Sequence, residues 1–235
     1  MEITLSIVGT AGRKEDAARL SRQHFEAMYI IAEKLINDCR KINYPITTLV
    51  SGGAAGADHV AVKLYLDNKV PHLRLFLPCA FEGGTFYDNG KSGIENPGGT
   101  ANYYHHLFQR NTRINSLTEL IIAKSRGAEF INVEKGFYAR NALVAKSDFL
   151  LAMTFGNKNE VKDGGTAHTV KCYLDRVKKE GFFDKSFHYD LNTGELFEGC
   201  WLPKPSSDKK FPKINKSPSK IIQFLKSVPN TSSQT

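Results

Sequence analysis

The sequence lacks the features that would place it in a membrane or hold it together by covalent links. No apolar run approaches the about 20 residues that a membrane span needs. Residues 1–9 include an acidic residue and only a strand-length apolar stretch, where a signal peptide needs a longer one. The four cysteines are scattered without a C-x-x-C pair, which favours buried thiols over a disulfide framework or a zinc site. We therefore expect a globular, intracellular, cytoplasmic protein without a metal site or a membrane partner.

Excess positive charge is almost absent from most of the chain. The formal net charge is +8, but residues 204–235 hold seven lysines and one aspartate, a net of +6, which leaves +2 for residues 1–203. This segment is rich in proline, serine and lysine and poor in apolar residues, a composition typical of disorder. It is either a solvated tail that aids solubility or a region for nucleic-acid binding or nuclear targeting.

Apolar residues follow an alternating pattern of strands and helices. Strands are predicted at 3–8, 47–51, 72–77 and 149–154, and helices at 14–41, 57–67, 101–126 (broken), 138–146 and 167–179. This alternation predicts an α/β fold in which helices cover both faces of a mostly parallel sheet.

Two further segments complete the predicted division of the chain. Residues 1–183 would form the main domain, in which 79–135 is a long insert of loops and helices. An Asn-Thr-Gly turn between alternating residues predicts a β-hairpin appendage over 184–203, followed by a disordered tail over 204–235.

Three glycine-containing turns follow predicted strands: GTAGR at 9–13, VSGGAAGADHVAV at 50–62 and KDGGTAHTV at 162–170. Strands that run parallel end at the same edge of the sheet, which is where open α/β sheets bind ligands. Glycines allow a tight turn, and the helix that follows offers unpaired amides and the positive end of its dipole. The turns therefore predict a binding site for phosphate or another anion, although glycine at such turns can also serve helix packing alone.

Several polar side chains beside these turns are candidate ligand contacts. Ser51, Thr10 and Thr166 offer hydroxyl groups, and Asp58 could cap its helix or accept from a ribose hydroxyl. Arg13 and Arg140 are suited to phosphate, and Asn141 to a ribose or base edge. The turns match neither G-x-G-x-x-G nor G-x-x-x-x-G-K-[ST], so dinucleotide dehydrogenases and P-loop NTPases are disfavoured and no cofactor is predicted.

Four motifs in order, SGGAAGAD at 51–58, ARNALVAKSD at 139–148, TFG at 154–156 and DGGTAHTV at 163–170, resemble the SLOG superfamily. The similarity is to its YspA/YpsA-like branch, and related families are DprA and the Lonely Guy phosphoribohydrolases. The resemblance implies a Rossmann-like three-layer sandwich that binds a nucleotide or nucleotide derivative, as a sensor or as an enzyme that processes it. The implied ligand contacts are Gly9, Gly52, Gly53, Gly164, Gly165 and Thr166.

The catalytic motif of the Lonely Guy hydrolases is incomplete in this chain. Where their pattern has glutamate and threonine, the aligned run has Val170 and His168, and valine can neither move a proton nor stabilise an oxocarbenium-like centre. Asp163 and His168 remain candidate catalytic residues, so an N-glycosidic hydrolase of nucleoside monophosphates is one alternative.

A second alternative is a DprA-like binder of single-stranded nucleic acid. It would use the basic residues of 204–235, with Tyr103, Tyr104 and Phe108 as stacking platforms. A homo-oligomer is also possible. The run NPGGTANYYHH at 96–106 suggests a helix capped by Thr100, with the paired histidines in an exposed loop.

Overall fold

A seven-stranded sheet forms the centre of the protein in its computed structural model, which describes residues 2–133, 136–162 and 164–202. The strand order is β6-β3-β2-β1-β7-β8-β9. Neighbouring strands run parallel from β6 to β8, and β9 pairs antiparallel with β8. The strands are β1 (Thr4–Gly9), β2 (Thr48–Ser51), β3 (His72–Leu77), β6 (Glu129–Asn132), β7 (Phe149–Thr154), β8 (Ser186–Asp190) and β9 (Glu195–Glu198).

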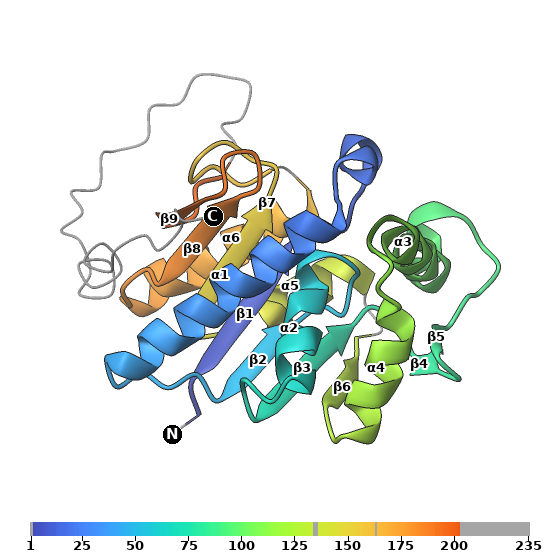
Figure 1. Ribbon diagram of the computed structural model, residues 1–235, viewed down its shortest axis with the longest axis horizontal. Coiled ribbons are helices and arrows are strands. Elements are labelled where there is room, and N and C mark those ends of the chain that lie inside the picture. The colour runs from blue at the N-terminus through green and yellow to red at the C-terminus, as the bar shows by residue number, and fades with distance from the viewer. Residues whose placement is uncertain (1, 134–135, 163, 203–235) are drawn as a thin grey trace, which may run out of the picture.

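Helices cover both faces of this sheet, so the predicted Rossmann-like three-layer sandwich is confirmed (Figure 1). The helices are η1 (Lys14–Ala18), α1 (Arg22–Lys41), α2 (Ala57–Leu66), η2 (Gly93–Glu95), α3 (Pro97–Thr112), α4 (Ser116–Ser125), α5 (Gly136–Val144) and α6 (Gly165–Glu180). Helices α1 and α2 lie on one face, and α5 and α6 lie on the other. None of the helices in the described ranges is long and apolar enough to span a membrane.

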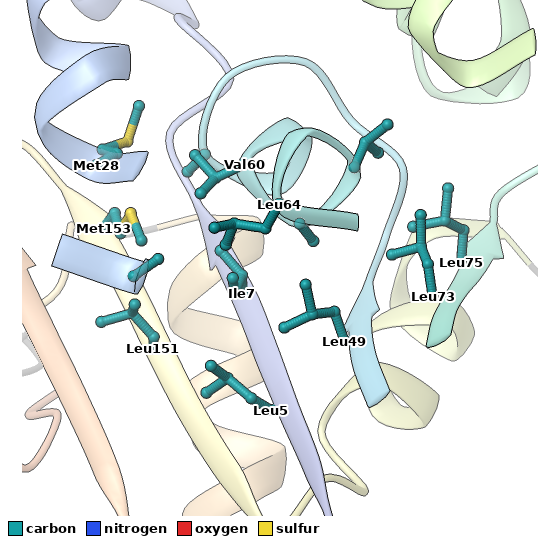
Figure 2. Packing of buried hydrophobic residues seen from close by; sticks show 14 of the residues in the cluster. Leu5, Ile7, Met28, Leu49, Val60, Leu64, Leu73, Leu75, Leu151 and Met153 are labelled. Carbon is teal, nitrogen blue, oxygen red and sulfur yellow. The ribbon is translucent and has the colours of Figure 1, made fainter. Parts of the chain in front are cut away.

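Side chains of the central strands alternate between two hydrophobic cores. Leu5 and Ile7 of β1 pack with Met28 of α1 and Leu64 of α2, and Figure 2 shows the same layer extending to strands β2, β3 and β7. Val8 points to the opposite face, where it joins buried residues of α5 and α6. A strand buried on both faces explains the near-continuous apolar run at 3–8, since each successive side chain enters one of the two cores.

The insert at 79–135 contains more structure than the sequence predicts. It holds a short hairpin of β4 (Phe81–Glu82) and β5 (Thr85–Phe86), followed by η2, α3 and α4. It then returns to the main sheet as β6, which pairs with β3. The sequence pattern does not predict strand β6, because β6 is a four-residue edge strand without a fully buried side chain.

Two helix predictions are wrong, one in its N-cap and one in its continuity. Helix α3 begins at Pro97, and its cap is Asn96, whose side-chain oxygen accepts from the Gly99 amide at 2.9 Å. The Thr100 hydroxyl donates instead to the Gly93 carbonyl. The helix expected over 14–41 is interrupted, because η1 ends before Ser21 caps a new helix, α1.

The predicted C-terminal hairpin is formed by β8 and β9. Strand β8 also pairs with β7 and is buried throughout, so the hairpin extends the main sheet. The predicted tail at 204–235 lies outside the described residues.

Candidate functional site

The three glycine turns lie together at the carboxyl edge of the sheet, because β2, β1 and β7 are parallel neighbours. The turn after β1 contacts the first turns of helices α2 and α6. The Ala57 amide of α2 donates to the Thr10 carbonyl at 2.9 Å, and the Thr166 hydroxyl of α6 donates to the Gly9 carbonyl at 3.0 Å. The strand order reverses between β1 and β7, so this edge is also the topological switch point of the sheet.

Gly9 is required by close packing. A Cβ atom at Gly9 would lie 2.0 Å from the Met153 carbonyl oxygen and 2.6 Å from the Ala57 Cβ. Both neighbours belong to regular secondary structure and have little freedom to move. The absence of a side chain at Gly9 therefore lets the β1 turn approach β7 and α2.

Asp58 supports the turn after β2 from inside the protein. Its Oδ2 atom accepts from the amides of Gly52 and Ala54, at 3.1 and 3.4 Å. The Ser51 hydroxyl donates to the Ile7 carbonyl at 2.9 Å, so it too faces inward. Burial raises the pKa of Asp58, and the nearby positive charge of Arg140 opposes that shift. Ser51 and Asp58 thus shape the turn, and their hydrogen bonds point away from solvent.

Two other amides of this turn are not used internally. Among the described residues, no hydrogen-bond partner is found for the amides of Gly53 and Ala55. Both residues line a pocket at the sheet edge. Gly53 has a φ of +67°, a left-handed conformation that glycine adopts without strain. Unpaired amides beside a pocket are the donors that an anion requires.

Arg140 and Asn141 of α5 connect the two paired-glycine turns. The Arg140 guanidinium donates to the Gly52 carbonyl at 3.0 Å and to the Asn141 side-chain oxygen at 2.8 and 3.1 Å. The Asn141 amide group donates to the Gly165 carbonyl at 3.2 Å. Burial lowers the pKa of Arg140, and Asp58 opposes this shift. A guanidinium has five donor hydrogens, so Arg140 keeps donors for a ligand while holding the turn.

The N-terminus of α6 is open to solvent. Gly164 is its N-cap, no side-chain cap is found within residues 2–133, 136–162 and 164–202, and both Gly164 and Gly165 are exposed. A Cβ atom at Gly165 would meet only the Asn141 Nδ2 atom within 4 Å, at 3.9 Å. The first-turn amides and the helix dipole of this 16-residue helix therefore favour a negative charge at this position.

The turn after β1 holds an internal polar network. The Thr10 hydroxyl donates to Asp16 at 2.9 Å and accepts from the Gly12 amide at 3.1 Å. Asp16 is also paired with Lys162 at 2.6 Å, which ties this turn to the segment before α6. Arg13 is exposed and lines the pocket. Of the predicted contacts in this turn, Arg13 is thus the side chain that faces the pocket.

Of the two candidate catalytic residues, His168 lies in the described part of the chain. His168 is half-buried, and its ring packs edge-on against Tyr138, with the ring centroids 4.8 Å apart. The ring nitrogens of His168 lie 3.9 Å from the Cys172 sulfur. Burial and the nearby positive charge of Lys171 lower the pKa of His168. Asp163 lies outside the described residues. Both residues remain candidates from the sequence.

The sequence analysis does not predict Phe137 and His105 as ligand contacts or supports, and it names Tyr104 as a stacking platform for single-stranded nucleic acid. Tyr104 of α3 and Phe137 of α5 line the pocket with Arg13 and Arg140. His105 is buried, not exposed in a loop, and its Nε2 atom bonds the Gly53 carbonyl at 3.1 Å. Burial lowers the pKa of His105 to about 3, so the neutral ring donates to this carbonyl. These residues come from distant segments, so no local spacing identifies them.

One expected stacking platform is wrong. Phe108 is buried in the main core, where its ring contacts Phe25 with the centroids 5.3 Å apart. It cannot stack on a nucleic-acid base. Tyr103 is 60% exposed, and Tyr104 is half-buried at the pocket. Binding of single-stranded nucleic acid by Tyr103 and the basic tail stays a prediction.

Comparison with known proteins finds similarity to a viral protein and to solved structures. No family model matches the chain. DNA processing protein A from Streptococcus pneumoniae is 16% identical, with a TM-score of 0.43, over 83% of this chain and 54% of that protein's length. "Uncharacterized protein R261" of Acanthamoeba polyphaga mimivirus is 34% identical over 170 residues, which cover 72% of this chain and 89% of the viral protein. With that identity over nearly the whole relative, the chain belongs to the same family as the mimivirus protein R261.

Proposed function

We propose that the protein binds a nucleotide or nucleotide derivative through phosphate, at the carboxyl edge of the sheet. The observation that carries this proposal is the meeting of two anion-compatible turns at one edge. The turn at 52–55 lines a pocket, and the amides of Gly53 and Ala55 have no hydrogen-bond partner among the described residues. The exposed N-terminus of α6 lies at the same edge of the sheet. Arg140 lies between the two turns and adds positive charge.

The predicted site residues divide into two roles under this proposal. Gly53, Gly164, Gly165, Arg13 and Arg140 meet the phosphate groups. The supporting group consists of Gly9, Thr10, Ser51, Gly52, Asp58, Asn141 and Thr166, whose contacts face inward or hold the turns in place. The resemblance of four motifs to the SLOG superfamily, and to its YspA/YpsA-like branch, supports the same class of ligand.

The substitution Gly165→Asp tests the proposal. The position is exposed and has space for a side chain, and an acidic residue at a helix N-terminus is favourable, so the fold should tolerate it. Its carboxylate would occupy the position of the anion and repel a phosphate group there. We expect affinity for AMP and ADP to fall at least about tenfold, which corresponds to about 1.4 kcal/mol. Isothermal titration calorimetry measures the loss.

The matched control is Gly165→Ala, which adds a Cβ atom at the same position without charge. It should bind within about twofold of the parent protein, a difference of about 0.4 kcal/mol. If the parent protein binds neither nucleotide at millimolar concentration, or if Gly165→Asp binds as well as Gly165→Ala, phosphate does not bind at this turn.

A further inference from the structure

Three segments bring an alternating stack of arginine and aromatic side chains to the pocket. The Cζ atom of Arg13 lies 5.0 Å from the ring centroid of Tyr104 and 5.7 Å from that of Phe137. The Cζ atom of Arg140 lies 5.5 Å from the Phe137 centroid. Arg13 follows β1, Tyr104 belongs to α3 and Phe137 to α5, so the stack exists only in the folded chain. Its members all line the pocket beside the turn at 52–55.

The remaining pocket wall is apolar. It includes Pro78, Phe86 and Ala101. Among the described residues that line the pocket, the charged side chains are Arg13 and Arg140, and both are positive. A ligand suited to this lining has a negatively charged group at one end and a planar, weakly polar group at the other.

We infer that Tyr104 and Phe137 stack the base of the bound nucleotide, which makes the ligand a nucleoside phosphate and not a sugar phosphate. This inference rests on the proposed function. The two rings already contact a planar, delocalised group, the Arg13 guanidinium, and a nucleobase offers the same kind of face. Because Arg13 is exposed, its guanidinium can leave the rings and contact phosphate when a base stacks.

Stacking recognises every base, since each has a π face. The described apolar wall carries no amide or carboxylate side chain that would read the hydrogen-bonding edge of a base. The site therefore discriminates weakly among bases, with purines favoured by their larger stacking area. The segment that supplies Tyr104 is the 79–135 insert, which thereby acquires a role in ligand recognition.

The test compares AMP with ribose 5-phosphate by calorimetry on the full chain. Stacking predicts that AMP binds about tenfold or more tightly than ribose 5-phosphate. Tyr104→Leu and Phe137→Leu should each weaken AMP binding about tenfold and leave ribose 5-phosphate binding unchanged. The matched control is Phe183→Leu, at an aromatic residue that is 87% exposed beyond the opposite end of α6. It should change the affinity for neither ligand.

Each contrary result has a distinct meaning. Equal binding of AMP and ribose 5-phosphate by the parent protein overturns the stacking inference and leaves the phosphate site intact. If the leucine variants lose affinity for AMP and for ribose 5-phosphate equally, the rings have a structural role, and the stacking inference is overturned as well. Failure of both ligands to bind the parent protein removes the proposed function together with the inference. Oligothymidylate that displaces AMP and binds at least tenfold more tightly would assign the stack to a nucleic-acid strand instead.

Discussion

Lowering the pH from about 7 to about 4.5 is expected to destabilise the protein by about 3 kcal/mol through His105 alone. Its pKa is about 3 in the folded protein, because the ring is buried, against an ordinary value of 6.5. At pH values between these two pKa values, His105 therefore binds a proton in the unfolded chain but not in the folded protein. The stability that the neutral His105 contributes is fully present above about pH 6.5. It is lost as the pH falls toward 3, at about 1.36 kcal/mol per pH unit.

Urea unfolding of the parent protein and of His105→Gln at several pH values measures this contribution. The glutamine side chain can still donate to the Gly53 carbonyl but does not titrate, so its stability should depend less steeply on pH. Burial also lowers the pKa of His188, which adds a loss of the same sign in both proteins. Identical pH dependence in the two proteins would show that His105 is not the group responsible.

Replacement of Gly9 by alanine is expected to lower the free energy of unfolding by at least about 3 kcal/mol, the upper part of the range for overpacked cores. The new Cβ atom would lie 2.0 Å from the Met153 carbonyl oxygen, which also accepts the Thr10 amide. It would lie 2.6 Å from the Ala57 Cβ on the other side. Relief would require β1 to move away from β7 or from α2, at the centre of the sheet.

Guanidinium chloride unfolding followed by circular dichroism measures this effect. Gly165→Ala serves as the control, since it makes the same chemical change at the same edge where the nearest atom lies 3.9 Å away. The midpoint should fall markedly for Gly9→Ala and remain nearly constant for Gly165→Ala. Equal midpoints for the two variants would mean that the sheet accommodates a side chain at Gly9.

The position of the glycine turns was predictable because it depends on local patterns. Each turn follows an apolar run long enough for a buried strand, and each precedes a helical period. Parallel strands joined by helices end at one edge, so their turns meet there without further information. The same reasoning did not find β6, because a short, half-exposed edge strand has neither a long apolar run nor a clear alternation.

The roles of individual polar residues were less predictable than their positions. Arg140 is 88 residues from Gly52, and His105 is 52 residues from Gly53, yet each bonds the carbonyl of that turn. Asp58 is close in sequence to the turn, but only its burial and its bonds to two turn amides show that it supports the backbone. Spacing along the chain carries no signal for such contacts.

The sequence by itself determined the class of fold, and it predicted the edge of the sheet at which a ligand would bind and the preference of that edge for an anion. These follow from residue periodicity and from glycine at the ends of strands, which are local properties of the chain. Only the tertiary structure decided which side chains face the pocket, which are used internally, and that the insert contributes an aromatic residue. Those outcomes depend on how separate segments pack, because burial and hydrogen bonding between distant residues are set by the whole fold.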